Sequence, residues 1–290
     1  MRGTFVPWLY AIGSSVRNVS LRDMAEDPVA MASAVVDSSK LFKTTMVCVN
    51  FDPTLWAEAA GCGTDWQAMP TTAPGGSADP NPDAVKEAPR IATLVDAIAR
   101  VKGALPNQPV SCAMPGPATL ASVLELGIPP ARMDQFTVGE LTGEFVSVLC
   151  EAQVDNIVIV EDPRCDEDAL APWVESGQYA RIAKLTDHYS VASTLLCPQL
   201  SLTQAHIAEF DSLTYVVAES GSTAAAHFDH AIKGFCVEGF GTGNVKATGE
   251  LGALEPDSYF LTTRWDLDPD TDLADIQQDI ATVQELLARR

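Results

Sequence analysis

The sequence has little positive charge. It contains 18 Lys and Arg residues against 39 Asp and Glu residues, for a formal net charge of −21. Such a surface repels phosphate groups, so we expect neither nucleic-acid binding nor docking on an anionic membrane. No apolar run reaches the length needed to span a bilayer, and the N-terminal stretch lacks the long apolar core of a signal peptide. We therefore expect a cytoplasmic protein.

The seven cysteines form neither a disulfide pattern nor a zinc pattern. Their number is odd, no two are spaced as CxxC, and most lie inside apolar, strand-like runs. This usage is typical of buried, reduced thiols. What the sequence does have is a large apolar fraction, 47% of residues against 20% charged, which is enough to fill a sizeable core. We expect one folded domain over residues 1–290.

Eight short apolar runs alternate with longer amphipathic segments. The expected strands are Phe5–Ala11, Thr45–Phe51, Val110–Ala113, Asn156–Glu161, Ala192–Leu196, Leu213–Ala218, Phe235–Val237 and Ser258–Thr263. Expected helices begin near Asp27 and cover Pro82–Gly103, Thr137–Cys150 and Leu273–Arg290. This alternation predicts an α/β fold, a single (β/α)8 TIM barrel. An open doubly wound sheet is the alternative, although the first strand is not followed by the three-glycine phosphate loop of that fold.

Residues 68–82 are rich in Pro, Gly, Ser and Thr and follow the turn at Gly61-Cys62-Gly63. This composition predicts a long loop insertion between the second strand and its helix. Because such loops lie on the catalytic face of a barrel, a mobile lid and a plain insertion are both compatible with the sequence.

The second strand ends on a group of polar residues. Its apolar run stops at Val49 and is followed at once by Asn50, Phe51, Asp52 and Pro53. A buried strand that delivers an amide and a carboxylate at its carboxyl end is how α/β enzymes build sites. Asp52 is therefore the first functional candidate. The alternative is that Asp52 caps the following turn, since Asp-Pro pairs often begin turns.

The other strand ends supply further candidates for the barrel mouth. We take Asp52, Glu161, Cys197 and Asp266 as catalytic candidates, and Arg17, Asn50, Asp162, Arg164, Gln199, Glu238, Arg264 and Trp265 as substrate-binding candidates. Several carboxylates in one cavity raise some of their pKa values, which suits proton transfer or the capture of a cation. The alternative is that these acids cap helices or pair with the nearby arginines.

Two segments resemble the uroporphyrinogen decarboxylase superfamily: residues 15–42, SVRNVSLRDMAEDPVAMASAVVDSSKLF, and residues 51–66, FDPTLWAEAAGCGTDW. They are most similar to the branch of corrinoid-dependent methyltransferases that includes methylcobalamin:coenzyme M methyltransferases. Gly116–Leu120, which resembles the family's GPxTL turn, and Leu267–Ile276 extend the resemblance over nearly the full chain. The resemblance implies a (β/α)8 barrel with its chemistry at the mouth.

Only some of the functional residues of each branch have a counterpart in this sequence. Asp52 matches the aspartate that contacts the pyrrole nitrogens in the decarboxylase branch, but that branch's RQAGRY motif is absent and only Arg17 lies nearby. In the methyltransferase branch, zinc is held by a His-x-Cys pair at the fifth strand and a cysteine near the eighth. Cys197 matches, Leu195 stands at the histidine position, and Trp265 and Asp266 replace the last cysteine.

The zinc set is thus incomplete, and Cys197 is the one candidate ligand, with Glu161, Glu238 or Asp266 as alternative oxygen ligands. The preferred function is methyl transfer between a small substrate and a corrinoid such as methylcobalamin, carried by a partner protein, or another acceptor. A metal-independent decarboxylase or lyase of a small carboxylated substrate and a non-catalytic binding protein are the alternatives. A homodimer is also compatible with the sequence.

Overall fold

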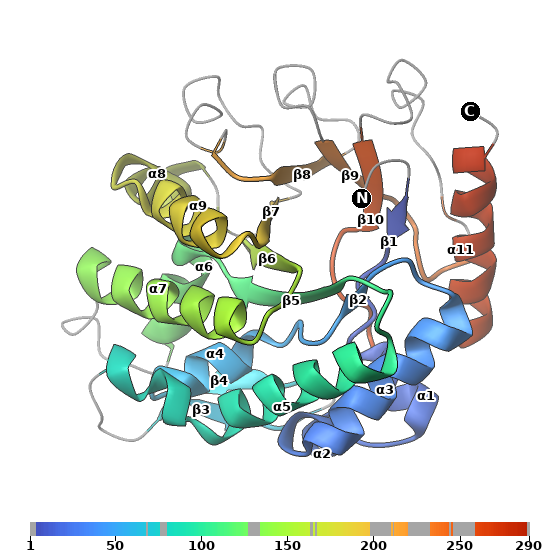
Figure 1. Ribbon diagram of the computed structural model, residues 1–290, viewed down its shortest axis with the longest axis horizontal. Helices are drawn as coiled ribbons and strands as arrows, with labels where there is room; N and C mark the ends of the chain where they lie inside the picture. The colour runs from blue at the N-terminus through green and yellow to red at the C-terminus, as the bar shows by residue number, and fades with distance from the viewer. Residues whose placement is uncertain are drawn as a thin grey trace.

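Eight parallel strands form one sheet whose order follows the chain, β1-β10-β9-β8-β7-β6-β5-β2 (Figure 1). The computed structural model describes residues 4–67, 69–75, 80–126, 134–162, 165, 167–197, 210, 212–219, 233–243, 245 and 259–288. The strands are β1 (Phe5–Val6), β2 (Val47–Cys48), β5 (Val110–Pro115), β6 (Asn156–Val160), β7 (Ala192–Leu196), β8 (Tyr215–Glu219), β9 (Lys233–Val237) and β10 (Tyr259–Thr263). All eight predicted strands are present, and the (β/α)8 barrel is confirmed.

Helices separate most of these strands, as the pattern predicts. They are α1 (Ile12–Arg17), α2 (Leu21–Glu26), α3 (Pro28–Phe42), α4 (Pro53–Ala59), α5 (Pro89–Ala104), α6 (Pro117–Glu125), α7 (Gln135–Glu151), α8 (Glu167–Glu175), α9 (Gln178–Tyr189) and α11 (Leu273–Ala288). Helix α3 begins where the sequence indicates: Asp27 is its N-cap, accepting the N–H of Val29, and Pro28 is its first residue.

The core lies between the sheet and these helices. Every residue of β5 and of β6 is buried, as expected for parallel strands covered on both faces. On the side of β1, helix α11 places Ile276, Ile280 and Val283 on one face, at helical spacing, against an apolar cluster that includes Phe5 and Phe235. Figure 1 shows α11 standing beside β1 and β10 at one edge of the barrel.

Side-chain hydrogen bonds tie the first strand to the last. The N–H of Trp8 donates to the hydroxyl of Thr263 at 3.0 Å, and the hydroxyl of Thr262 donates to the carbonyl of Val6 at 2.6 Å. On the other side of β1, the hydroxyl of Thr45, just before β2, donates to the carbonyl of Phe5 at 3.3 Å. The two ends of the sheet therefore meet at β1, which brings the strand ends into one mouth.

Two segments differ from the sequence prediction. The single helix expected over Pro82–Gly103 is wrong: a 3-10 helix, η1 (Pro82–Glu87), precedes α5, and Ala88 between them is extended, with ψ 130°. A residue before proline is driven out of helical conformation by the proline ring, and Pro89 follows directly. Within the predicted loop at 68–82, β4 (Thr71–Ala73) pairs antiparallel with β3 (Gly63–Asp65). Part of that segment is therefore a hairpin.

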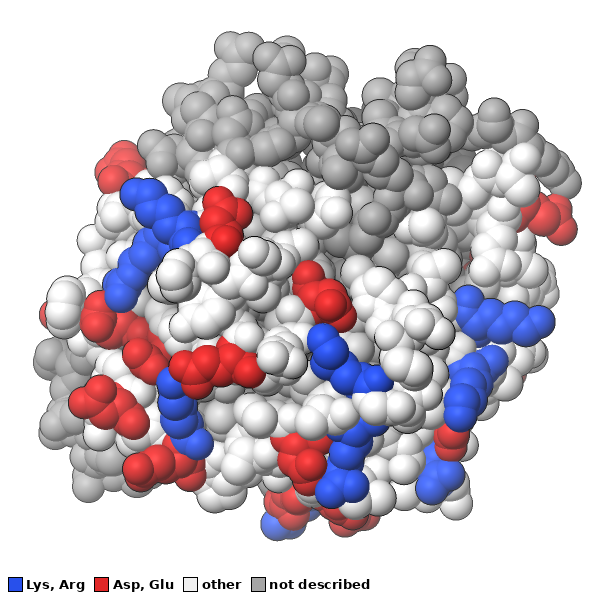
Figure 2. Space-filling model, viewed as in Figure 1, with Lys and Arg blue, Asp and Glu red and all other residues white. Residues whose placement is uncertain are grey.

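The face of the molecule seen in Figure 2 carries both acidic and basic side chains. In Figure 2, acidic and basic side chains lie next to one another on the visible face. Many of them are paired across or along helices, including Arg17 with Asp37, Lys86 with Glu151, and Arg181 with Glu140. A search of the described residues found no helix with the length and hydropathy needed to cross a bilayer.

Candidate active site

Two adjoining cavities open at the carboxyl ends of the strands. The larger, of about 260 Å³, is called cavity A here and reaches from Phe51 and Asp52 after β2 to Asp162 after β6. The smaller, of about 160 Å³, is called cavity B and lies between the ends of β1, β2 and β10. The two share Phe51, Asp52, Pro53, Pro70 and Trp265. The site therefore lies at the end of the barrel where (β/α)8 enzymes hold their functional groups.

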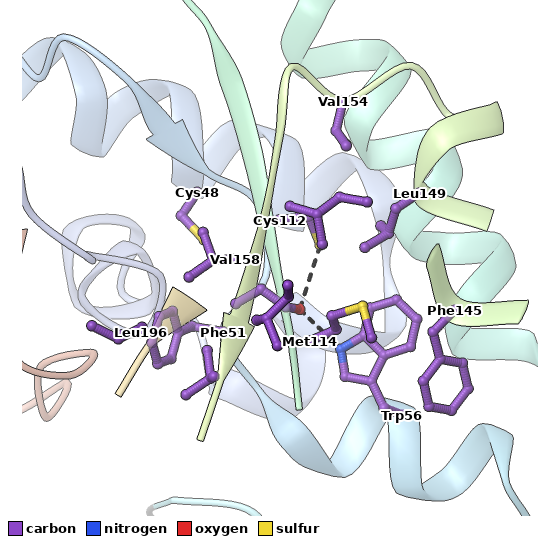
Figure 3. Close-up of a cluster of buried hydrophobic side chains, with 14 of the residues drawn as sticks. Cys48, Phe51, Trp56, Cys112, Met114, Phe145, Leu149, Val154, Val158 and Leu196 are labelled. Atoms are coloured by element: carbon purple, nitrogen blue, oxygen red, sulfur yellow. Dashed lines mark hydrogen bonds between the residues drawn. The ribbon is translucent and has the colours of Figure 1, made fainter. Parts of the chain in front are cut away.

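Aromatic and sulfur-containing side chains form the floor of cavity A. Trp56 from α4 packs against Phe145 with ring centroids 4.8 Å apart, and its indole N–H donates to the carbonyl of Ala113 at 2.9 Å. Figure 3 shows Met114 beside this indole, among other buried side chains. Above them, Phe51 meets Trp265 edge to face at 5.5 Å. Cavity A is thus apolar at its base, with polar groups placed at its rim.

Asp52 belongs to a buried, hydrogen-bonded group that we call the Arg90 cluster, formed by Asp52, Thr54, Glu58 and Arg90. One oxygen of Asp52 accepts the N–H and the hydroxyl of Thr54 at 2.8 and 2.7 Å, so Asp52 does cap α4, as the alternative interpretation proposed. The other oxygen accepts Nη2 of Arg90 at 2.5 Å. Asp52 lines both cavities while its charge is balanced from behind.

Arg90 was not among the sequence candidates. Its Nη1 also reaches Thr54 Oγ1 at 3.2 Å and Glu58 Oε2 at 3.3 Å, and its guanidinium lies over the ring of Trp66 at 4.8 Å. Burial, the largest single influence, lowers the pKa of Arg90, but the charge and hydrogen bond of Asp52 together with nearby Tyr10 and Glu58 raise it overall. The signal was in the helix pattern, because Arg90 occupies the buried stripe of α5, four residues before Leu94.

Glu161, predicted as a catalytic residue, is fully buried and does not line either cavity. Its carboxylate accepts the N–H and hydroxyl of Thr119 at 2.8 and 2.6 Å and the hydroxyl of Tyr179 at 2.5 Å. Burial raises its pKa, and these donors lower it in part. A Cβ at Gly116 would lie 2.0 Å from Glu161 Oε1, so the Gly-Pro turn allows this close approach. Glu161 thus ties β6 to the start of α6.

At cavity B, Asp266 and Tyr10 form what we call the Asp266 corner. Asp266 Oδ2 accepts the N–H of Ala11 at 2.8 Å. Asp266 Oδ1 and the hydroxyl of Tyr10 are both buried, and neither finds a hydrogen-bond partner within the described residues. Burial raises the pKa of Asp266 from 3.8 to about 7, although backbone N–H groups such as that of Ala11 lower it. Burial also raises the pKa of Tyr10, so its hydroxyl keeps its proton.

The other predicted residues divide between the mouth and its surroundings. Trp265 lines both cavities, and Asp162 lines cavity A. Asn50 is buried behind the rim, where its amide donates to the carbonyls of Asp52 and Ala113. Glu238 and Arg264 are exposed and line a third, neighbouring cavity together with Trp265 and Asp266.

The remaining candidates lie away from both cavities or outside the description. Arg17 pairs with Asp37 on the outer helices, with its side chain half exposed, and is not part of either lining. Cys197 is buried at the end of β7, where burial raises the pKa of its thiol. Arg164 and Gln199 lie outside the described residues. No group of three or more His, Cys, Asp or Glu side chains placed to hold a metal was found within the described ranges.

The fold and the two cavities define a (β/α)8-barrel protein whose functional groups gather at the carboxyl ends of its strands. The family model of uroporphyrinogen decarboxylase (URO-D) matches residues 11–157, half of the chain. The protein belongs to this family. The match begins one residue after Tyr10 and includes the whole Arg90 cluster and all of β5.

A solved structure extends the similarity over the rest of the fold. A methyltransferase from Methanosarcina mazei superposes with a TM-score of 0.73 over 97% of this chain and 94% of that chain, at 16% sequence identity. At this identity the similarity shows a shared fold. A comparison with curated proteins found no match.

Proposed function

We propose that the protein is a methyltransferase that moves a methyl group between a small substrate in the two cavities and a corrinoid carried by a partner protein. The observation that carries the proposal is the Asp266 corner. One carboxylate oxygen of Asp266 has no partner within the described residues, and Asp266 lines a small aromatic cavity beside Asp52, whose two oxygens are both paired. The methyltransferase with the same fold supports this choice over the other activities of the family.

The cavities set the size of the substrate. At about 260 and 160 Å³ they fall at or below the lower end of ordinary small-molecule sites. A corrin ring would therefore face the mouth from outside, and only the methyl-carrying substrate would enter. When bound, the corrinoid supplies a cobalt centre that gives or takes the methyl group.

The chain's own contribution is orientation and proton handling. The heteroatom that gains or loses a methyl group changes its charge, and a carboxyl group with a pKa near 7 can accept or return a proton at that atom. Asp266 is placed for this role because its Oδ1 is uncommitted, whereas Asp52 is held by Thr54 and Arg90. Asp52 therefore acts as a fixed hydrogen-bond acceptor at the wall that the two cavities share.

The residues present do not fit the zinc site that the resemblance implies. Cys197 is buried at the end of β7, but Leu195 stands where the histidine ligand of that site is expected, so a single cysteine remains of the pair. Asp266, at the position expected for a cysteine ligand, is engaged with the N–H of Ala11. We therefore assign no step to zinc.

A decarboxylase or lyase is the second candidate, and the same carboxyl group favours it. With a pKa of about 7, Asp266 can also hold the proton that a carbanion-like intermediate takes up after loss of CO₂. The linings argue against a polycarboxylated porphyrinogen, because the described residues of both cavities include no Lys or Arg. A small monocarboxylate is the substrate that this candidate predicts.

The test is methyl exchange with methylcobalamin and with reduced cobalamin, followed by absorption spectroscopy, across thiol, amine and hydroxyl compounds. We expect transfer with at least one compound, and a loss of kcat of about a hundredfold in Asp266→Asn, the scale of general acid–base catalysis. Asp96→Asn, the same change in an exposed pair on α5, should leave the rate unchanged.

Absence of transfer in both directions over the panel would contradict the proposal. Release of CO₂ from a small carboxylate, lost in Asp266→Asn, would establish the second candidate. A tight stoichiometric complex without turnover would instead identify a non-catalytic binding protein.

A further inference from the structure

Tyr10 and Asp266 line cavity B, and each has a buried polar atom that the described residues leave without a partner, Tyr10 Oη and Asp266 Oδ1. Tyr10 is 3% exposed, and both residues line the cavity. Buried polar groups in native proteins are nearly always hydrogen-bonded, so each exception needs an explanation such as a bound molecule. A carboxylate oxygen only accepts hydrogen bonds, whereas a tyrosine hydroxyl can accept or donate. When Asp266 is ionised, the occupant must therefore offer it at least one hydrogen-bond donor, and a cationic occupant favours that ionised form.

The charges around the cavity select the sign of that occupant. Asp52 and Asp266 both line it, and the part of the lining that the structure describes has no basic side chain. Arg90 lies behind Asp52 and is shared with Glu58, so this cluster of two carboxylates and one guanidinium keeps a net negative charge. Arg264 is exposed and lines the neighbouring cavity. A cation is favoured here, and an anion is repelled.

The walls select the shape. Tyr10, Phe51 and Trp265 present aromatic surface to the cavity, and such rings attract ammonium groups and the methyl groups they carry. A volume of about 160 Å³ has room for about five water-sized groups, since one water occupies about 30 Å³ of liquid. The occupant is therefore a compact cation with a few methyl-sized groups.

We infer that cavity B binds a small protonated, N-methylated amine, whose N–H donates to Asp266 Oδ1 and lies beside the Tyr10 hydroxyl while its methyl groups contact Phe51 and Trp265. This inference rests on the proposed function, and it names the substrate class. As a methyl donor, the ammonium breaks one C–N bond and the electron pair stays on nitrogen, which leaves as the neutral amine. A reduced corrinoid on a partner protein would supply the electron pair for the new bond to the methyl carbon.

The test uses the intact protein and four probes at constant ionic strength: dimethylammonium, trimethylammonium, tetramethylammonium and tert-butanol. Binding is measured by saturation-transfer NMR titration. We expect dimethylammonium and trimethylammonium to bind about tenfold more tightly than tetramethylammonium, which has no N–H, because a hydrogen bond to a charged group is worth about that factor. The neutral tert-butanol, which has the shape of trimethylammonium, should bind more weakly still.

Two variants locate the binding. Asp266→Asn should weaken trimethylammonium binding about tenfold and leave tert-butanol unchanged, and Tyr10→Phe should weaken it about threefold. Asp96→Asn is the control and should bind as the native protein does. Because the probe series is measured on the native protein, the inference remains testable even where a variant does not fold.

Several outcomes would overturn the inference. These are equal affinity for trimethylammonium and tert-butanol, no saturable binding of any ammonium because water alone fills the cavity, or unchanged affinity in Asp266→Asn. The proposed function fails separately. Ammonium binding without methyl exchange would retain this binding site and reject the methyltransferase, whereas methyl exchange with a thiol that ammonium probes do not inhibit would do the reverse.

Discussion

The Arg90 cluster and the Asp266 corner both place an aspartate at the carboxyl end of a strand, yet they are built in opposite ways. In the Arg90 cluster, each carboxylate oxygen of Asp52 has a partner, and Arg90, which balances its charge, is 4% exposed, although Arg90 Nε is buried without a partner within the described residues. In the Asp266 corner, one oxygen holds a backbone N–H and the other has no partner within the described residues. A buried carboxylate paired at both oxygens stabilises the fold, whereas a carboxylate with one unpaired oxygen can accept a hydrogen bond from a ligand.

The largest effect should come from breaking the paired side. Arg90→Met leaves Asp52 buried without its counter-ion, and we expect a loss of about 3–5 kcal/mol in the free energy of unfolding. Urea denaturation measures it, with Arg100→Met as the control, since Arg100 forms an exposed pair with Asp96 worth less than about 1 kcal/mol. Partial recovery in the double variant Asp52→Asn/Arg90→Met would assign the loss to the uncompensated carboxylate. A loss below about 1 kcal/mol would show that the pair is not a structural element.

The unpaired carboxylate of Asp266 should make the stability of the protein depend on pH. The folded-state pKa of Asp266 is raised from 3.8 to about 7, so between these values the folded protein keeps a proton that the unfolded chain has released. The stability of the native protein relative to Asp266→Asn should then fall as the pH rises from about 4 to about 7, by on the order of 2–4 kcal/mol. Denaturation of both proteins across this range measures the difference. A flat difference would mean that Asp266 titrates normally, and Asp96→Asn should give such a flat line.

A third comparison uses two buried tyrosines. The hydroxyl of Tyr179 donates to the fully buried Glu161, so Tyr179→Phe removes one donor from that carboxylate. We expect a loss of about 1–3 kcal/mol in the free energy of unfolding. Thermal and urea denaturation at neutral pH measure it. No loss would indicate that the two hydrogen bonds from Thr119 suffice for Glu161.

The smallest effect should come from the other tyrosine. Because the hydroxyl of Tyr10 is buried without a partner in the described chain, Tyr10→Phe removes a polar group and no hydrogen bond. Stability should stay the same or rise by about 0.5–1 kcal/mol. The same denaturation assay, run beside Tyr179→Phe, separates the paired hydroxyl from the unpaired one. A loss above about 1 kcal/mol would indicate an ordered water bound to Tyr10 in the folded protein.

The sequence predicts the barrel well because its strands are buried on both faces and therefore read as continuous apolar runs. β6 and β7 begin where the apolar runs Asn156–Glu161 and Ala192–Leu196 begin. The prediction of one helix over Pro82–Gly103 was wrong because Ala88, the residue before Pro89, is kept out of helical conformation and interrupts an otherwise helical pattern. The hairpin at β3 and β4 was missed because its strands are three residues long and carry little apolar signal.

The site was predictable only where it depends on strand ends. Asp52 and Asp266 follow from their positions after β2 and β10, but the way each is paired does not. Arg90 lies 38 residues from Asp52 in the sequence. Its pairing could have been suspected only because a charged residue lies on the apolar face of the predicted helix. The nearness of Tyr10 to Asp266 could not be predicted from the sequence, since it follows only from the pairing of β1 with β10. The predicted roles of Cys197, Glu238 and Arg17 stay predictions.

The hydrogen bond from Ala11 to Asp266 spans 255 positions of sequence, as does that from Trp8 to Thr263. Contacts of such separation cost the most loop-closure entropy and slow folding. While the protein is being synthesised, the Arg90 cluster can assemble as soon as residue 90 has left the ribosome. Tyr10 must wait until residue 266 has emerged. All residues of the Arg90 cluster are therefore made early, whereas the Asp266 corner, where we propose that the ligand binds, can be completed only near the end of synthesis.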